Sequence, residues 1–223
     1  MKNSQPNISL IIPAHNEAEN IGRVLQIVTK APELKEIIVV ADACQDNTAE
    51  VAKNFGVKVI IRPTSQGKGS AMIEGFKHAS GDIIMFADAD LENLTLEHVR
   101  QILAPVTSGQ AVMSVGLRDR VLGLGAVIPK LLPMYAIGGE RAMTRDFFNA
   151  LPQDQNILDF GIETVMNYYA KKHGLPVATT VLKNLHQVIK EKKWGFWPGL
   201  KWRFKLTHQV WRTRHLMKRK QNL

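Results

Sequence analysis

Short apolar runs alternate with longer amphipathic segments along the first hundred residues. Strands are predicted where apolar residues cluster, at 8–13, 36–42, 57–61 and 83–87. Helices are predicted between them, near 21–28, 48–55 and 70–79, because apolar residues there recur at intervals of three and four. Strands that alternate with helices of this length form βαβ units around a parallel sheet. The pattern therefore predicts an α/β fold in which helices flank a mostly parallel sheet.

The fourth of these strands ends in two acids. Residues 83–87 are apolar without alternation, as in a strand that is buried on both faces, and Asp88 and Asp90 follow. Ligands of open α/β sheets bind at the carboxyl ends of strands, and residues two apart in an extended segment face the same side. Paired carboxylates suit Mg²⁺ or Mn²⁺ together with substrate phosphates. A second interpretation makes Asp90 the N-cap of a helix from about Leu94 to Leu103.

Polar residues follow the other predicted strands at the same edge. Right-handed crossovers place the carboxyl ends of parallel strands along one edge. That edge would collect Pro13, Ala14, Asn16, Glu17, Asp42, Gly67, Lys68 and Gly69. With a nucleotide diphosphate, Asp42 would accept from a base N–H, Glu17 from ribose hydroxyls, and Lys68 would face the pyrophosphate. The alternatives are a solvated loop for Lys68 and a helix N-terminus for Asn16 and Glu17; the spacing of a P-loop is missing.

The composition is that of one globular domain. A chain of 223 residues with 45% hydrophobic content can bury a full core. No apolar run approaches the ~20 residues of a membrane span, and the first residues do not form a signal-peptide pattern. Cys44 is the single cysteine, which excludes an internal disulfide and cysteine-rich zinc sites. We expect a cytoplasmic protein in which Cys44 is a bystander thiol rather than a nucleophile.

Basic charge is concentrated near the end of the sequence. The net charge is +9; residues 183–223 hold 12 Lys and Arg against one acid, whereas the preceding residues hold 17 against 19. All four Trp also lie in this segment. From 197 to 219, basic and apolar residues fall on different sides of a helical wheel, which predicts a basic amphipathic helix at an anionic membrane surface. Packing on the body is an alternative, and no base-reading motif supports a nucleic-acid partner.

If the bound nucleotide is the donor of a transferred group, residues 104–160 should hold the acceptor of that group, and their pattern is less specific. The apolar, glycine-punctuated segment 122–135 is interpreted as core packing, an apolar acceptor site or a flap that orders on donor binding. Arg118, Arg120 and Lys130 either bind an anionic acceptor or form solvated surface. Glu163 stands near the start of a predicted helix, where it acts as general base, positions the acceptor or stabilises the helix N-terminus.

These motifs, taken in order, resemble those of the family 2 nucleotide-sugar glycosyltransferases with the GT-A fold. The motifs are Pro13-Ala-His-Asn-Glu17, Asp42 in Val-Val-Ala-Asp-Ala, Gly67-Lys-Gly69 and Phe86-Ala-Asp-Ala-Asp-Leu91. The later segments are similar to the layout in glucosyl-3-phosphoglycerate synthases and polyprenyl-phosphate sugar transferases; they are Gly138–Arg145, Phe160–Glu163 and a strand into Leu185–His186. The resemblance covers roughly residues 7–190 in sequential order.

The resemblance implies roles for the matched residues. Nucleotide binding falls to Pro13, Ala14, Asn16, Glu17, Asp42, Gly67 and Lys68. Asp88 would contact the ribose or donor sugar, and Asp90 and His186 would hold Mg²⁺ or Mn²⁺; a surface or supporting position is the alternative for His186. Two departures stand out. The sequence reads Ala41-Asp-Ala-Cys44 where the family usually has Asp-Asp-Gly-Ser, and the glycine-rich acceptor segment is not evident in 118–135.

The resulting prediction is a metal-dependent glycosyltransferase with Asp88 and Glu163 as catalytic residues. It would move a sugar from a nucleotide-sugar, a UDP-sugar by preference, to an acceptor hydroxyl or lipid phosphate. Residues 1–190 would form the GT-A domain, with a nucleotide half at 1–103 and an acceptor half at 104–190. Residues 191–223 would form a basic helical tail at the inner face of the membrane. An oligomer is compatible with this prediction, and the alternatives are a nucleotidylyltransferase and a catalytically silent membrane adaptor.

Overall fold

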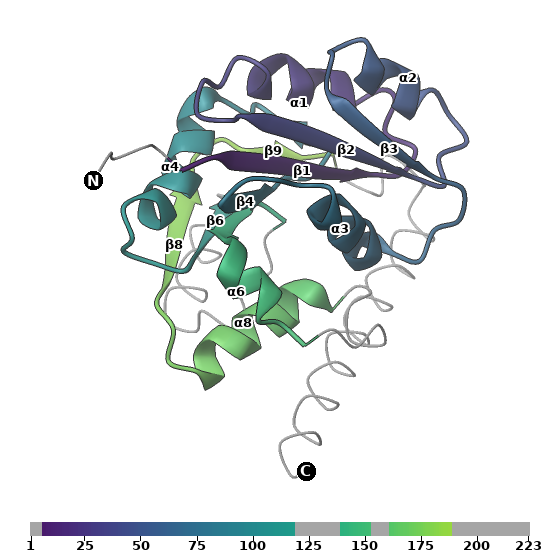
Figure 1. Cartoon of the computed structure of the whole chain (residues 1–223). Coiled ribbons are helices and arrows are strands. Elements are labelled where there is room, and N and C mark those ends of the chain that lie inside the picture. Colours follow the sequence, from purple (N-terminus) through teal and green to yellow (C-terminus); the bar gives the residue numbers. More distant parts are fainter. Residues whose placement is uncertain (1–5, 119–138, 153–160, 189–223) are drawn as a thin grey trace.

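The computed structural model describes residues 6–118, 139–152 and 161–188. Its centre is a seven-stranded sheet with the order β3-β2-β1-β4-β7-β6-β8 (Figure 1). The strands are β1 (Ile8–Ala14), β2 (Glu36–Asp42), β3 (Lys58–Arg62), β4 (Ile83–Phe86), β6 (Met113–Arg118), β7 (Arg141–Thr144) and β8 (Val177–Leu182). A separate two-stranded antiparallel sheet joins β5 (Leu91–Glu92) to β9 (His186–Gln187).

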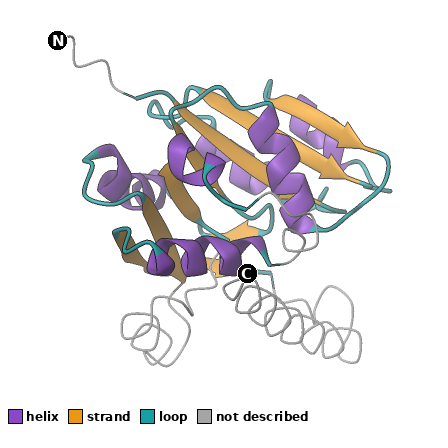
Figure 2. Cartoon of the chain, turned by 60° about the horizontal axis from the view of Figure 1, so that its bottom comes forward, coloured by secondary structure: helices purple, strands orange, loops and turns teal. Residues whose placement is uncertain are grey.

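Helices cover both faces of the large sheet (Figures 1 and 2). They are α1 (Ile21–Val28), α2 (Thr48–Lys53), α3 (Lys68–Lys77), α4 (Leu96–Thr107), α6 (Arg145–Asn149) and α8 (Ile162–Lys172). Strands β1 to β4 pair in parallel, as the alternating pattern predicts. The second half is mixed, because β7 runs antiparallel to both β4 and β6, while β6 and β8 are parallel. The prediction of a mostly parallel α/β sheet is confirmed.

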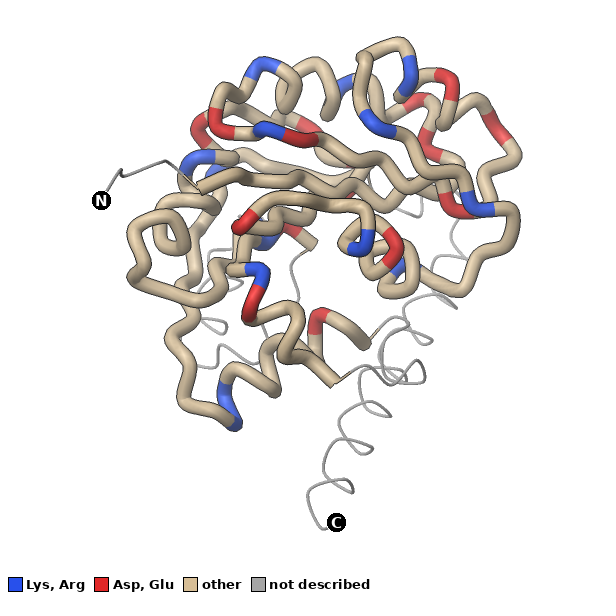
Figure 3. Tube along the Cα trace, in the orientation of Figure 1, with Lys and Arg blue, Asp and Glu red and all other residues tan. Residues whose placement is uncertain are grey.

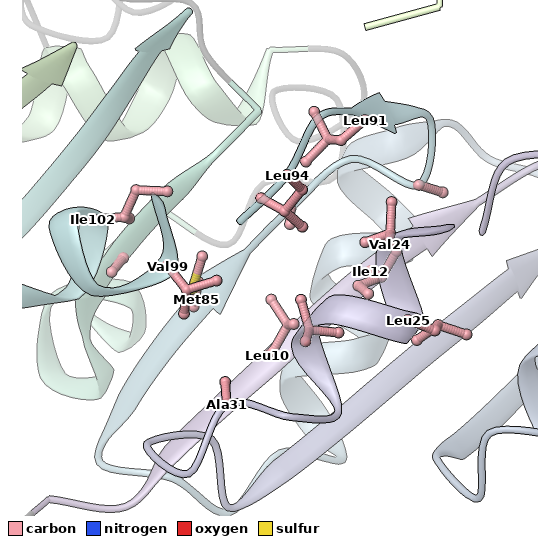
Figure 4. Close-up of a cluster of buried hydrophobic side chains, with 14 of the residues drawn as sticks. Leu10, Ile12, Val24, Leu25, Ala31, Met85, Leu91, Leu94, Val99 and Ile102 are labelled. Carbon is pink, nitrogen blue, oxygen red and sulfur yellow. The ribbon is translucent and has the colours of Figure 1, made fainter. Parts of the chain in front are cut away.

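The two faces of the sheet have separate apolar cores, since alternate residues of a strand point to opposite faces. Leu10 and Ile12 of β1 pack with α1, α2 and α4, whereas Ile11 packs with α3, α6 and α8. Strands β1 and β4 contain no charged residue, so the tube is tan there in Figure 3. Figure 4 shows the first core, with strand residues next to Val24 and Val99. Burial on both faces explains the unbroken apolar run of β4.

The chain after β4 differs from one detail of the sequence interpretation. Strand β4 ends at Phe86, so Asp88 and Asp90 lie in the segment after the strand, and Asp90 is in a turn. The N-cap of α4 is Thr95, whose side chain accepts from the His98 N–H while the His98 ring accepts from the Thr95 N–H. The interpretation of Asp90 as the N-cap of this helix is therefore wrong.

Several predicted features fall outside the described residues. They are the segment 122–135, Arg120, Lys130 and the basic tail of 191–223. Within the part of the chain that the structure describes, no helix has the length and apolar character needed to span a bilayer.

Candidate functional site

Two carboxylates converge beyond the end of β4. Asp88 is 8% exposed and Asp90 is 5% exposed. The Gln187 Nε2 of β9 donates to Asp90 Oδ1 at 2.8 Å and to Asp88 Oδ2 at 3.3 Å. The two acids therefore face one side chain, as predicted, although the turn rather than strand alternation brings them together.

Lys68 joins this acidic pair to Glu163 at the start of α8. It is the first residue of α3, after Gly67, whose φ of 93° no ordinary side chain adopts easily. Its Nζ lies 2.7 Å from Asp88 Oδ1 and 2.9 Å from Glu163 Oε1. Burial by itself would lower the pKa of Lys68, but the two carboxylates outweigh it and raise that pKa above its ordinary value. The structure thus brings Lys68, Asp88 and Glu163 into one ion-paired group.

A second basic group lies on the other side of Asp88. Arg118, the last residue of β6, places Nη2 at 3.8 Å from Asp88 Oδ2 and Nε at 3.4 Å from Glu140 Oε2. Its Nη1 donates to Gln187 Oε1 at 2.6 Å. Burial of Arg118 opposes its charge, yet Glu140 and Asp88 hold its pKa above the ordinary value. Arg118 therefore joins three segments that are distant in sequence: the residues after β4, the residue before β7, and β9.

Glu140 is a functional candidate that sequence reasoning did not assign. Its side chain is fully buried, and burial raises its pKa to about 7 although Arg118 opposes this shift. The preceding Gly139 lies against Asp88, because a Cβ built on it would stand 2.4 Å from Asp88 Oδ1. The signal available in the sequence was an acid inside the Gly138–Arg145 segment, but nothing local indicated that β7 would place it beside β6.

The predicted nucleotide residues gather at the neighbouring strand ends. Pro13 and Ala14 end β1 beside Val40 and Ala41 of β2. Asn16, at a φ of 53°, accepts from the Gln45 N–H through Oδ1 at 2.8 Å. The loop after β1 is therefore tied to the loop after β2. Neither Asn16 nor Glu17 is the N-cap of α1, which is Asn20.

Asp42 and Glu17 already have local partners. Arg62 Nη1 lies 3.2 Å from Asp42 Oδ1, and the Ser65 hydroxyl donates to Asp42 Oδ2 at 2.6 Å. Glu17 Oε2 accepts from Asn20 Nδ2 at 2.8 Å. Asp42 is 4% exposed, and its carboxylate contacts Arg62 and Ser65. Contact with a nucleotide base remains the predicted role of Asp42.

The loop after β2 departs from the family motif in a structurally visible way. Ala43 has a φ of 50°, in the left-handed region that favours glycine, and it stands where the family motif has Gly. Cys44 Sγ lies within hydrogen-bond distance of the Asn16 N–H and the Ala14 carbonyl. Cys44 thus supports the loop, which agrees with a structural rather than a nucleophilic thiol.

His186 does not join the acidic pair in this structure. In the β5–β9 pairing, His186 is opposite Glu92 and Gln187 is opposite Leu91. Leu91 is 1% exposed and belongs to the core, so its face of the small sheet points inward, and His186 is exposed. The side chain of β9 that contacts Asp90 is therefore Gln187.

The residues at this edge suit a divalent cation only with help from a ligand. Among the described residues, no group of three or more His, Cys, Asp or Glu side chains is arranged to hold a metal. Asp90 Oδ1 and Asp88 Oδ2 nevertheless provide two hard oxygen atoms that face the same amide N–H group of Gln187. Mg²⁺ and Mn²⁺ are commonly bound by one or two such groups with substrate phosphates completing the shell. The donor set therefore fits a cation that binds together with a diphosphate.

The chain is thus an α/β protein with a cluster of charged side chains near the carboxyl ends of its parallel strands. Residues 9–167 match the model of Glycosyl transferase family 2. The chain belongs to this family, and the resemblance drawn from its motifs is confirmed.

Similar proteins include two archaeal enzymes. The low-salt glycan biosynthesis hexosyltransferase Agl6 of Haloferax volcanii is 28% identical over 192 residues, 74% of this chain and 45% of that protein. The dolichol-phosphate mannosyltransferase of Pyrococcus furiosus is 35% identical over 117 residues, 50% of this chain and 33% of that protein. The chain thus spans less than half the length of these relatives.

A solved structure extends the similarity to the fold. The glucosyl-3-phosphoglycerate synthase of Mycobacterium tuberculosis, in complex with Mn²⁺, UDP-glucose and glycerol 3-phosphate, superposes with a TM-score of 0.68 at 25% identity. The match covers 82% of this chain and 72% of the other. The predicted GT-A fold is confirmed.

Proposed function

We propose that this chain is a metal-dependent glycosyltransferase that moves a sugar from a UDP-sugar to an acceptor hydroxyl or lipid phosphate. The observation that supports it most is the convergence of Asp88, Asp90, Lys68 and Glu163 at the carboxyl edge of a family 2 fold. The similar synthase was solved with Mn²⁺ and UDP-glucose, which favours UDP as the nucleotide. The proposed cation is Mg²⁺ or Mn²⁺, held by Asp90, one side chain of β9 and the donor diphosphate.

The chain's own groups would position the donor. The nucleoside would lie over the loops after β1 and β2, where Pro13, Ala14, Asn16, Glu17 and Asp42 gather. The diphosphate would lie near Gly67 and Lys68, because helix N-termini and a lysine together attract anions. Lys68 would contact the diphosphate in place of one of its two carboxylate partners, Asp88 or Glu163. When bound, the cation would offset charge that develops on the leaving diphosphate.

Asp88 and Glu163 would act on the sugar and the acceptor. Lys68 and Arg118 fix the Asp88 carboxylate from two sides, so it is oriented before a donor sugar arrives. Glu163 stands on the acceptor side of Lys68 at the start of α8, where it would take the proton of an attacking hydroxyl. A lipid phosphate acceptor carries an ionised oxygen and needs no such base. The similarity to a dolichol-phosphate mannosyltransferase supports that second class of acceptor.

Calorimetry of UDP binding with and without Mn²⁺ tests the proposal. Wild-type protein should bind UDP at least tenfold more tightly with Mn²⁺, and Asp90→Ala should lose that gain and its turnover. Glu50→Ala is the matched control, because Glu50 is an exposed acid paired with Lys53 on α2. Metal-assisted UDP binding of wild-type strength in Asp90→Ala would contradict the metal role. UDP binding without any effect of Mn²⁺ in the wild-type protein would favour the silent adaptor.

A screen of nucleotide-sugars, scored by release of UDP or another nucleotide, then identifies the donor. Release from one UDP-sugar and its absence in Asp88→Ala would support transfer. Release of pyrophosphate from a nucleoside triphosphate and a sugar phosphate would instead indicate a nucleotidylyltransferase.

A further inference from the structure

Gln187 contacts both acids of the site and Arg118 through one side-chain amide. Its amide Nε2 donates to both carboxylates, at 2.8 Å to Asp90 and 3.3 Å to Asp88, and its Oε1 accepts from Arg118 at 2.6 Å. One amide therefore occupies the space between the two acids. That is also the space from which a cation would contact Asp90.

The backbone pairing explains why Gln187 and not its neighbour is there. Residues directly opposite in an antiparallel pair place their side chains on the same face. Gln187 is opposite Leu91, which is buried in the core, and His186 is opposite Glu92, which is partly exposed. Strand β9 would have to shift by one residue for His186 to take the inward face and Gln187 the outward face. The Val188 N–H donates to the Asp90 carbonyl at 3.1 Å and fixes the present register next to the site.

The geometry suits metal ligation after one rotation. A half-turn of the amide about its last side-chain bond exchanges Nε2 and Oε1. The carbonyl oxygen would then lie near the present position of Nε2, which is 2.8 Å from Asp90 Oδ1. Neighbouring oxygen ligands of an octahedral Mg²⁺ at ~2.1 Å lie ~3.0 Å apart. The observed spacing is therefore close to that of two adjacent ligands of one cation.

We propose that Gln187 supplies its carbonyl oxygen to the divalent cation held by Asp90, at the position that the sequence assigns to His186. This inference rests on the proposed function, since it presumes the cation. The turned amide would place its NH2 group where Oε1 now accepts from Arg118, so the Arg118 side chain would have to move away from it, toward its other partners Glu140, now at 3.4 Å, and Asp88, now at 3.8 Å. The amide would thus hold the acids together without metal and ligate the metal when it binds.

Mn²⁺ binding measured by electron paramagnetic resonance tests the assignment without relying on turnover. The free Mn²⁺ signal is followed during titration into the full chain at a fixed, saturating UDP concentration. We expect Asp90→Ala and Gln187→Met each to weaken Mn²⁺ binding at least tenfold, and His186→Ala to change it less than about twofold, since loss of a supporting or ligating group costs 10–100-fold. Gln187→Met keeps the length of the side chain and removes its oxygen.

Gln187→Glu separates ligation from simple hydrogen bonding. As a ligand, a glutamate keeps the oxygen and adds charge, so Mn²⁺ binding should equal or exceed that of the wild type. If Gln187 acted only as an N–H donor, the glutamate would repel both aspartates, Mn²⁺ binding would weaken, and the assignment would be overturned. Thermal unfolding of each variant shows whether it is folded, and the two Gln187 substitutions give independent readings.

The outcomes distinguish this inference from the proposed function. Loss of Mn²⁺ binding in Asp90→Ala and His186→Ala, with wild-type binding in Gln187→Met, overturns the role of Gln187 and keeps the metal enzyme. Wild-type Mn²⁺ binding in Asp90→Ala overturns the cation site itself, and the role of Gln187 with it.

Discussion

The Asp88 carboxylate lies against the backbone at Gly139, which makes that glycine a sensitive position. A Cβ there would approach three Asp88 atoms at 2.4–2.6 Å, so Gly139→Ala must displace the carboxylate from Lys68 and Arg118. We expect Gly139→Ala to weaken Mn²⁺-assisted UDP binding tenfold or more, measured by calorimetry. Gly22→Ala is the control, because its Cβ would meet no atom closer than 3.7 Å and lies in α1. Equal binding by both variants would show that Asp88 does not need its present position.

Glu140 should make stability depend on pH. Its pKa is raised from 4.5 to about 7 in the folded chain, chiefly by burial and with Asp88 adding to the shift, while Arg118 and Lys68 oppose it. Between these pH values the folded protein binds a proton that the unfolded chain has lost. The free energy of unfolding should therefore fall as pH rises from about 4.5 to about 7, by roughly 1 kcal/mol per pH unit.

Urea unfolding of wild type and Glu140→Gln at pH 5 and pH 8 measures this contribution. The variant cannot ionise at this position. The free energy of unfolding of the variant minus that of the wild type should therefore be larger at pH 8 than at pH 5. An unchanged difference between the two proteins at both pH values would show that Glu140 does not titrate in this range.

Some of the site residues lie in short sequence motifs, and others do not. Asp88, Lys68 and Glu163 stand in short motifs, and the structure joins them as one ion-paired group. Arg118 and Gln187 come together only because β6 and β9 are brought to the same place by long-range pairing, which no local pattern encodes. Long-range pairing also sets which side chain of β9 faces the acids: Gln187 does so in this structure, and the role of His186 as a metal ligand, which the resemblance implies, stays a prediction.

Among the elements, α4 has the most complete N-terminal cap. The Thr95 hydroxyl accepts from the His98 N–H at 3.3 Å, and the His98 Nε2 lies 3.0 Å from the Lys183 carbonyl. We expect Thr95→Ala to lower the free energy of unfolding by about 1 kcal/mol, because a helix N–H loses its acceptor. Thr107→Ala at the other end of α4 should change it by less than about 0.5 kcal/mol, since that hydroxyl only donates to carbonyls of the preceding turn. Equal urea midpoints for the two variants would contradict the importance of the cap.

Periodicity predicted the elements of the first half well, because each strand there is followed by the helix that covers it. The mixed half was predicted less fully. Strand β7 enters between β4 and β6 in antiparallel orientation, although 22 residues separate β6 from β7 in the sequence. Local alternation does not state which strand is a neighbour, so the sequence pattern did not predict this strand order.

At the scale of the whole molecule, the charge is divided between a near-neutral body and a basic end. Residues 183–223 hold 12 Lys and Arg against one acid and contain all four Trp. Basic residues near an anionic bilayer contribute about 1 kcal/mol each, and interfacial tryptophans add apolar contact. We propose on this basis that the tail brings the site to an anionic membrane surface, where a lipid phosphate acceptor would be located.

Removal of residues 195–223 should separate membrane attachment from donor binding. Sedimentation with vesicles that contain a third phosphatidylglycerol should retain the full chain at least tenfold better than the shortened chain, and neutral phosphatidylcholine vesicles should retain neither. Both proteins should bind UDP with the same Mn²⁺ dependence, because Lys68, Asp88 and Asp90 belong to the body. High salt should release the full chain, since screening weakens surface attraction. Equal retention of the two proteins by the anionic vesicles would place any membrane contact on the body instead of the tail.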